Sequence, residues 1–218
     1  MHAKGISPDL LAAAYAGDAE AQVSVASSYK HGIRVAKDFD MSVAFYRKAA
    51  EQGHAEAQEA LLEFYYYGEE IPKDYAEAAF WARRGAAQGH AYAQLWLGSF
   101  YEKGEVLPQD YLLAAIWYRE AADAGFSNAQ WFLGLLYGKG LGVPQDYVQA
   151  YFWQSLAVAG WKSWTMPAHE KYVSELDGLR TKLDDGELSA IERRTNRWYK
   201  DHPLQTLQTQ SSDQERLK

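Results

Sequence analysis

The chain of 218 residues contains no cysteine. Disulfide bonds, thiolate nucleophiles and zinc sites with cysteine ligands are therefore excluded, and the composition fits a reducing compartment. Basic residues are also in the minority, because 22 Lys and Arg stand against 29 Asp and Glu, for a formal net charge of -7 at pH 7. A negative chain repels phosphate groups, so we expect no nucleic acid among its partners.

Long apolar runs are also missing. No stretch approaches the roughly 20 consecutive apolar residues that a membrane-spanning helix needs. Residues 1–9 lack the apolar core of a signal peptide, and the apolar stretch Leu10–Ala16 follows an acidic residue, Asp9. These absences predict a cytoplasmic protein without a membrane span. Hydrophobic residues still make up 48% of the chain, which is enough to build a core.

One pattern organises the sequence: residues of the same type recur every 36 positions. The dipeptide Ala-Gln begins at Ala21, Ala57, Ala93 and Ala129. The same step links two sets of glycines, a set of tyrosines, a set of aspartates and a set of large aromatics: Gly17, Gly53, Gly89, Gly125; Gly32, Gly68, Gly104, Gly140; Tyr29, Tyr65, Tyr101, Tyr137; Asp38, Asp74, Asp110, Asp146; Phe45, Trp81, Trp117, Trp153. A period of this length predicts structural units that stack on one another.

Each unit has the pattern of two helices. Small and apolar residues recur at i, i+4 and i+7 or i+8, which is helical spacing, and the alternation typical of strands is absent. The first helix of a unit lies between two glycines, as at Gly53 and Gly68, and the second begins at an aspartate such as Asp74. Two capping boxes are predicted at the starts of second helices, formed by Asp74 with Glu77 and by Asp146 with Gln149.

This pattern resembles the Sel-1-like repeat family, which is related to the tetratricopeptide repeats. The resemblance covers roughly residues 10–160 and is carried by Leu97-Gly98, Leu133-Gly134, Ala121–Gly125 and Gly140–Asp146. It implies an all-α protein, built as a right-handed α/α solenoid of about four 36-residue helix-turn-helix units, and a bacterial origin. Val25-Ala26 and Leu61-Leu62 depart from the Leu-Gly pair of the family.

Four segments are expected along the chain. Residues 1–17 form an N-terminal capping helix, residues 18–160 the repeats, residues 161–202 two C-terminal capping helices and residues 203–218 a flexible tail. The capping helices are placed at Lys171–Leu183 and Glu187–Tyr199, and Asp184 with Glu187 forms a third capping box. Caps with a polar outer face protect the open ends of a solenoid from aggregation.

Signs of catalysis are weak, and we predict no enzyme activity, no cofactor and no metal site. His54 and His90 occupy equivalent positions in neighbouring units, so they lie about 10 Å apart, which is too far to share a zinc ion. Gly138–Gly142 lacks the Gly-Lys-Ser/Thr ending of a phosphate loop. The Ser-x-x-Lys sequence at Ser27–Lys30 has no companion motif. A β-lactamase-like or cell-wall hydrolase, the label of some relatives, stays as an alternative.

The outward positions of the first helices predict a protein-binding face. Residues equivalent to Ala57 and Leu61 face the stack, whereas those equivalent to Glu56, Glu59 and Ala60 point outward, on what the resemblance implies is the concave side. Exposed aromatic side chains there would mark a partner site. The predicted contact residues are Glu59, Glu63, Tyr66, Tyr67, Tyr92, Trp96, Ser99, Glu102, Trp131, Phe132 and Leu135. For Trp131, packing inside the stack is the alternative.

The favoured function is a non-catalytic scaffold or adaptor that binds a partner protein in a concave groove. Acidic residues in the groove predict a basic or amphipathic partner segment. The resemblance implies a signalling, virulence or toxin-immunity role. A structural repeat within a larger assembly is the remaining alternative.

Overall fold

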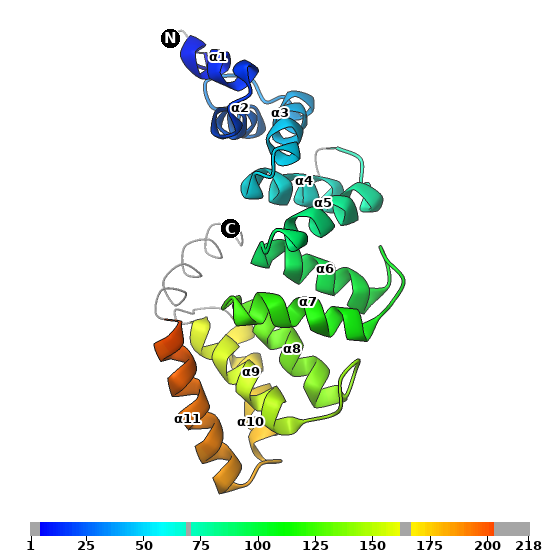
Figure 1. The fold of residues 1–218 in the computed structure, drawn as a ribbon, viewed down its shortest axis with the longest axis vertical. Coiled ribbons are helices and arrows are strands. Elements are labelled where there is room, and N and C mark those ends of the chain that lie inside the picture. Colours follow the sequence, from blue (N-terminus) through cyan, green and yellow to red (C-terminus); the bar gives the residue numbers. More distant parts are fainter. Residues whose placement is uncertain (1–4, 69–70, 162–166, 203–218) are drawn as a thin grey trace. The chain divides into compact units, whose positions relative to one another are not determined.

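The computed structural model describes residues 5–68, 71–161 and 167–202. Every regular element in these ranges is an α-helix, which confirms the all-α prediction (Figure 1). The helices of the described ranges are α1 (Pro8–Ala16), α2 (Ala19–His31), α3 (Phe39–Glu51), α4 (Ala55–Tyr67), α5 (Tyr75–Ala87), α6 (Ala91–Lys103), α7 (Tyr111–Asp123), α8 (Ser127–Lys139), α9 (Tyr147–Gly160), α10 (Pro167–Arg180) and α11 (Asp185–Asp201).

The chain divides into two compact units, Met1–Ala93 and Gln94–Lys218. In the first unit, each helix from α1 to α4 packs on the next one along the chain. In the second unit, α7 packs on α8 and α8 on α9, while α10 and α11 both pack on α9. Packing between neighbours in sequence is the arrangement expected of stacked helical hairpins.

The recurring aspartates begin the second helix of each hairpin, as predicted. The side chains of Asp38, Asp74, Asp110 and Asp146 each accept a hydrogen bond from a backbone amide three residues later, at 2.9–3.1 Å. These bonds satisfy amides that have no partner inside the helix. The preceding helices end at glycines such as Gly140, whose φ of 69° favours a residue without a side chain.

Two of the three predicted capping boxes are wrong, and the reason is the same for both. The backbone N–H that the box would serve is already used, because Asp74 donates to the carbonyl of Tyr65 at 2.8 Å and Asp146 to the carbonyl of Tyr137 at 3.0 Å. The third predicted box, formed by Asp184 and Glu187 at the start of α11, is confirmed.

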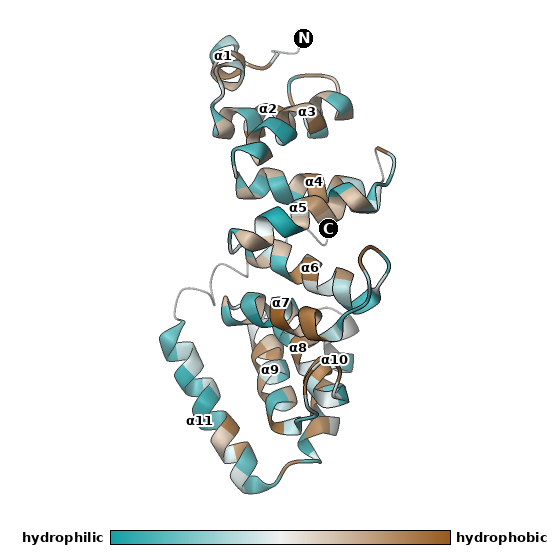
Figure 2. Ribbon diagram, turned by 45° about the vertical axis from the view of Figure 1, so that its right-hand side comes forward, coloured by the Kyte–Doolittle hydropathy of each residue, from teal (hydrophilic) through white to brown (hydrophobic). Residues whose placement is uncertain are grey.

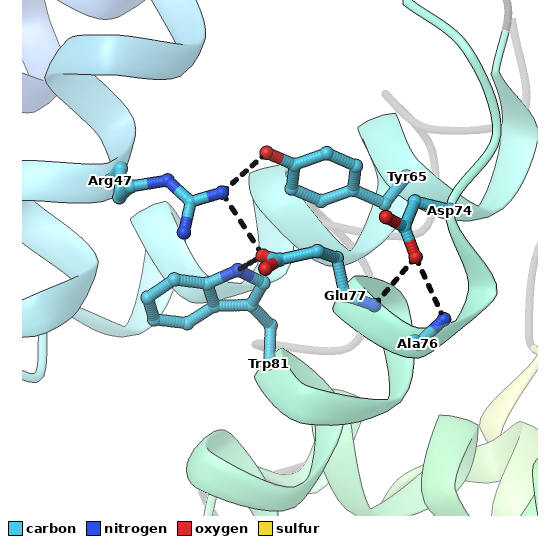
Figure 3. A network of polar contacts seen from close by, with 6 residues as sticks. All are labelled: Arg47, Tyr65, Asp74, Ala76, Glu77 and Trp81. Carbon is cyan, nitrogen blue, oxygen red and sulfur yellow. Dashed lines mark hydrogen bonds and ion pairs between the residues drawn. The ribbon is translucent and has the colours of Figure 1, made fainter.

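Glu77 serves instead in a polar network of the second hairpin (Figure 3). Its Oε2 accepts from the indole N–H of Trp81 at 3.1 Å and from a guanidinium N–H of Arg47 at 3.0 Å. Arg47 also donates to the hydroxyl of Tyr65 at 2.6 Å. The glutamate therefore satisfies a buried indole and links α3 to α5.

Three of the four recurring large aromatics are buried, whereas the fourth, Trp117, is partly exposed. Phe45, Trp81 and Trp153 are each at most 2% exposed. The guanidinium of Arg47 lies 5.8 Å from the ring centroid of Trp81, and that of Arg119 lies 5.3 Å from that of Trp153. The two arginines are themselves separated by two 36-residue steps, so the sequence period corresponds to a repeated packing arrangement.

The recurring glutamines explain part of the period as well. The side-chain amides of Gln22, Gln58 and Gln130 donate to backbone carbonyls eight residues earlier, at 3.0–3.2 Å. Each bond ties the first helix of a hairpin to the helix before it. A buried carbonyl is satisfied each time, which is why an amide recurs in an otherwise apolar setting.

Helices also stand where the caps were predicted. α10 begins four residues before the predicted Lys171 and α11 two residues before the predicted Glu187, and α1 (Pro8–Ala16) lies within the N-terminal cap predicted at residues 1–17. The predicted tail at residues 203–218 lies outside the described residues. Within the described part of the chain, no helix combines the length and the hydropathy needed to cross a bilayer.

Candidate protein-interaction face

In the first unit, four of the predicted contact residues form an aromatic and acidic surface on α4. Tyr67 is 47% exposed, and Glu59, Glu63 and Tyr66 are partly exposed. Ala60, which was predicted to point outward, is only 7% exposed, so that prediction is wrong. Its small side chain lies at the edge of the packed face of α4.

Three contacts hold this surface in place. The hydroxyl of Tyr92 donates to Glu63 Oε1 at 2.6 Å. The ring of Tyr66 lies 5.2 Å from that of Tyr67 and 5.6 Å from that of Tyr75. Glu63 is therefore engaged inside the protein rather than being a simple acidic contact. Tyr75 was missed as a surface aromatic, although its position after Asp74 was part of the repeat pattern.

In the second unit, Ser99 and Glu102 converge on a tyrosine that sequence reasoning overlooked. The hydroxyl of Tyr118 donates to Glu102 Oε2 at 2.6 Å and also bonds with Ser99. Burial, and then the nearby charge of Glu102, raise the pKa of Tyr118. The register of Tyr118 holds Tyr46 two units earlier, but Ala82 in the unit before and Gln154 in the unit after, so the tyrosine does not recur in every unit.

The remaining residues of the second unit fall into an exposed set and a buried one. Trp96, Phe132 and Leu135 are partly exposed. The ring of Phe132 stacks on Tyr118 with centroids 5.4 Å apart, and Trp96 lies 5.7 Å from Phe100. Trp131 is only 4% exposed, so the prediction of an exposed anchor is corrected in favour of the alternative, packing inside the protein.

Trp131 is covered by the C-terminal cap. The ring of Tyr172, on α10, lies edge-on to Trp131 at 4.6 Å, and that of Trp161 lies 5.7 Å away. Seven residues further along both helices, a Cβ placed on Gly138 would lie 4.0 Å from Leu179 Cδ2. Equal spacing on α8 and α10 means that the two helices run in the same direction. The outward register of α8 therefore already binds a helix.

The residues considered for catalysis have other contacts. The ammonium of Lys30 lies 4.9 Å from the ring centroid of Phe64, and Ser27 bonds with Tyr46, whose pKa burial raises to about 12. His54 Nε2 lies 3.1 Å from Glu20 Oε1. Over the described residues, no three side chains of His, Cys, Asp or Glu are grouped so as to hold a metal ion.

Comparison with known proteins connects this architecture to one family. The Sel1 repeat matches residues 19–54, 55–90, 91–126 and 127–159, which together make up more than half of the chain. The chain has no match among curated proteins.

Solved structures agree with the repeat assignment. A protective antigen of uropathogenic Escherichia coli that displays an SLR fold is 31% identical, with a TM-score of 0.76 over 93% of this chain and 42% of its own. A Sel1 repeat protein from Oxalobacter formigenes is also 31% identical, with a TM-score of 0.66 over 77% of this chain and 48% of its own. This chain therefore spans less than half the length of either protein.

A sel1 repeat protein from Klebsiella pneumoniae shares the fold at 21% identity and a TM-score of 0.51, over 85% of this chain and 97% of its own. The predicted α/α solenoid is confirmed by these likenesses together with the packing of consecutive helices. Sel1 repeat proteins are generally protein-interaction scaffolds, and their fold is typically non-enzymatic. With four repeats in register along its length, the chain belongs to the Sel1 repeat family.

Proposed function

We propose that the chain is a non-catalytic scaffold that holds a helical segment of a partner protein against the outward side of its first helices. The supporting observation is the contact of α10, which packs on α9, with two residues of α8: Tyr172 meets Trp131, and Leu179 lies beside Gly138. In the fourth repeat, a helix of the same chain, α10, contacts the outward side of the first helix. The equivalent side of the other first helices therefore has a shape that can accept a helix. Helix-in-groove binding relies on such spaced apolar anchors.

The same register continues on α6 with partly exposed residues. Leu95 stands 36 positions before Trp131, and Trp96 and Ser99 share its helix. In the first unit, Glu59 stands at this register on α4, and Tyr67 lies eight residues further along the same helix. An amphipathic partner helix would place its apolar side on the aromatic residues. A basic flank would match the acidic residues, because complementary charge favours association and register.

The roles predicted for such a scaffold are those of an adaptor in signalling, in virulence or in neutralising a toxin, in the cytoplasm. The likeness to a bacterial protective antigen is compatible with the second of these. The contacts of Lys30 and Ser27 with Phe64 and Tyr46 support a non-catalytic role, because neither residue activates the other.

The experiment compares partner capture by the full chain and by single variants. The intact chain serves as bait in cells of its source organism, the captured protein is identified by mass spectrometry, and its affinity is then measured with purified components. Trp96→Ala should weaken binding by roughly 30-fold, the usual effect of truncating an aromatic anchor.

Tyr15→Ala is the matched control, because Tyr15 is 65% exposed on α1 and lies off the proposed face. It should leave the affinity unchanged. An affinity that is unaltered by Trp96→Ala, with the helical circular dichroism intact, would contradict the proposed function.

A further inference from the structure

The second helix of the third repeat, α7, exposes an apolar surface that is separate from the outward side of the first helices. Leu112 and Ile116 lie one helical turn apart and are 57% and 46% exposed. Trp117 beside them is partly exposed, whereas the equivalent Trp81 and Trp153 are buried. In Figure 2 the first half of α7 is coloured as predominantly hydrophobic. Single exposed apolar residues are ordinary, but neighbouring ones on one face mark an interaction site.

The same surface is covered in the fourth repeat by the protein's own α11. Phe152, 36 positions after Ile116, is 1% exposed, and the guanidinium of Arg194 lies 3.6 Å from its ring centroid. Arg194 also donates to Gln149 Oε1 at 3.0 Å. Three residues before this arginine, Ile191 is 3% exposed. The outward side of α9 is thus a docking surface for an amphipathic helix with an aliphatic residue and an arginine one turn apart.

A cation recurs over this register, and its source differs between repeats. In the second repeat, Arg84 lies over Phe80 from the same helix, at 5.8 Å. In the fourth repeat, the cation is Arg194 from α11. In the third repeat, the position equivalent to Arg84 carries Glu120, an exposed carboxylate. α7 therefore presents an aliphatic surface with an acidic residue where its neighbours have a cation.

The charged residues of α7 also favour a positively charged side chain on the docked helix. Its own Arg119 is directed at the following hairpin, where it donates to the hydroxyl of Tyr137 and lies over Trp153 at 5.3 Å. Asp110 caps the start of the helix, and Asp123 ends it. A helix that docks here gains from carrying a positive charge next to its apolar side.

We propose that the outward side of α7, formed by Leu112, Ile116 and Glu120, is a second docking surface, and that its occupant is an amphipathic helix of a partner protein that carries an arginine next to its apolar side and binds as α11 binds α9. The aliphatic residue of this helix lies on Leu112 and Ile116, and its arginine pairs with Glu120. The surface is continuous in register with the α9–α11 interface. It does not depend on binding at the first-helix face.

The probe is a fluorescent peptide with the sequence of residues 184–202, added to the full-length chain and followed by anisotropy. Because α11 already covers α9 in the same chain, the peptide should bind at α7. Ile116→Asp and Glu120→Arg should each weaken binding at least tenfold. Asp185→Arg, which makes the same charge change at an exposed position of α11, should have no such effect. A peptide with Arg194→Ala should bind the unchanged protein about tenfold more weakly.

Three results would overturn the proposal. The first is absence of peptide binding at millimolar concentration to a chain whose circular dichroism is that of folded protein. The second is binding that Ile116→Asp leaves unchanged, which would mean that the peptide displaces α11 from α9. The third is a concentration-dependent dimer, seen by light scattering, that Ile116→Asp abolishes, which would assign the surface to a second copy of the chain.

Discussion

Gly98 and Tyr118 fit together so closely that a Cβ on the glycine would lie 2.6 Å from the tyrosine ring. The next repeat has a similar contact, because a Cβ on Gly134 would lie 2.6 Å from Gln154 Cγ. In the repeat before, the glycine position holds Leu62, and the position of Tyr118 holds Ala82. The large side chain of the pair is on the second helix of the hairpin in the third repeat (Tyr118) and on the first helix in the second repeat (Leu62). This exchange accounts for the departure from the family's Leu-Gly pair at Leu62.

Gly98→Ala should therefore destabilise the protein by about 1–3 kcal/mol, since the ring of Tyr118 is fully buried and has little room to move. The control is Gly178→Ala on α10, where a Cβ meets no atom within 4 Å. That substitution should stabilise the helix by up to about 1 kcal/mol. Urea unfolding measures both, and equal effects of the two substitutions would contradict the packing described for Gly98.

Tyr172→Ala should loosen α10 from α8. Removal of the ring takes away the edge-on contact with Trp131 and exposes an indole that is now 4% exposed. A loss of roughly 2 kcal/mol is expected for a partly buried aromatic. Hydrogen exchange should become faster in α10 and leave α2 to α5 unchanged. Unchanged protection of α10 would show that Tyr172 does not hold it.

Trp81 and Trp153 are equivalent, but of the two indole N–H groups only that of Trp81 has an acceptor in the ranges that the structure describes. Substitutions at Glu77 and at the equivalent Gln149 should therefore change the stability in opposite directions. Glu77→Ala should destabilise by about 1–3 kcal/mol, because it leaves the buried N–H of Trp81 without an acceptor. Among the described residues, Trp153 Nε1 has no hydrogen-bond partner, and Gln149 stands where the other repeat has Glu77. Gln149→Glu should supply the acceptor and stabilise by about 1 kcal/mol. Thermal unfolding checks both signs, and destabilisation by Gln149→Glu would refute the equivalence.

Asp123 predicts a dependence on pH. Asp123 lies at the surface, and partial desolvation of its carboxyl group raises its pKa, with a further contribution from Glu120, against the opposing charges of Arg119, His202 and Arg194. The folded state thus holds this proton more tightly than the unfolded chain, and stability falls as the pH rises above the ordinary pKa of 3.8. Asp123→Asn should be more stable than the parent at pH 7 and equal to it below about pH 3. A variant less stable at pH 7 would contradict the raised pKa.

The period of the sequence was enough to predict the hairpins, because each recurring residue has a local task. The aspartates cap, the glycines end helices and the glutamines bind a carbonyl eight residues back. The period could not predict contacts between a side chain of one repeat and residues of another repeat or of a capping helix. Glu77 serves an indole and an arginine instead of its own helix start, and Trp131 is buried by Tyr172, which lies beyond the repeats.

For the predicted binding residues too, the sequence predicted the side of the helix but not the contacts with other helices. Tyr67 is 47% exposed, as the helical spacing implied. Glu63 and Glu102 lie on the predicted side, yet each accepts a hydrogen bond from a tyrosine that comes from a different helix. Outward direction on a helix can be read from spacing, whereas contacts between helices depend on the partner side chain at each register.

The central claim is that a partner helix lies on the outward side of the first helices. The direct measurement places a photo-crosslinking amino acid at Tyr67, at Trp96 and, on a second helix, at Phe80, and identifies what each captures in cells of the source organism. The account predicts that Tyr67 and Trp96 capture the same protein and that Phe80 does not. Capture of that protein from Phe80, with none from Tyr67 or Trp96, would contradict it.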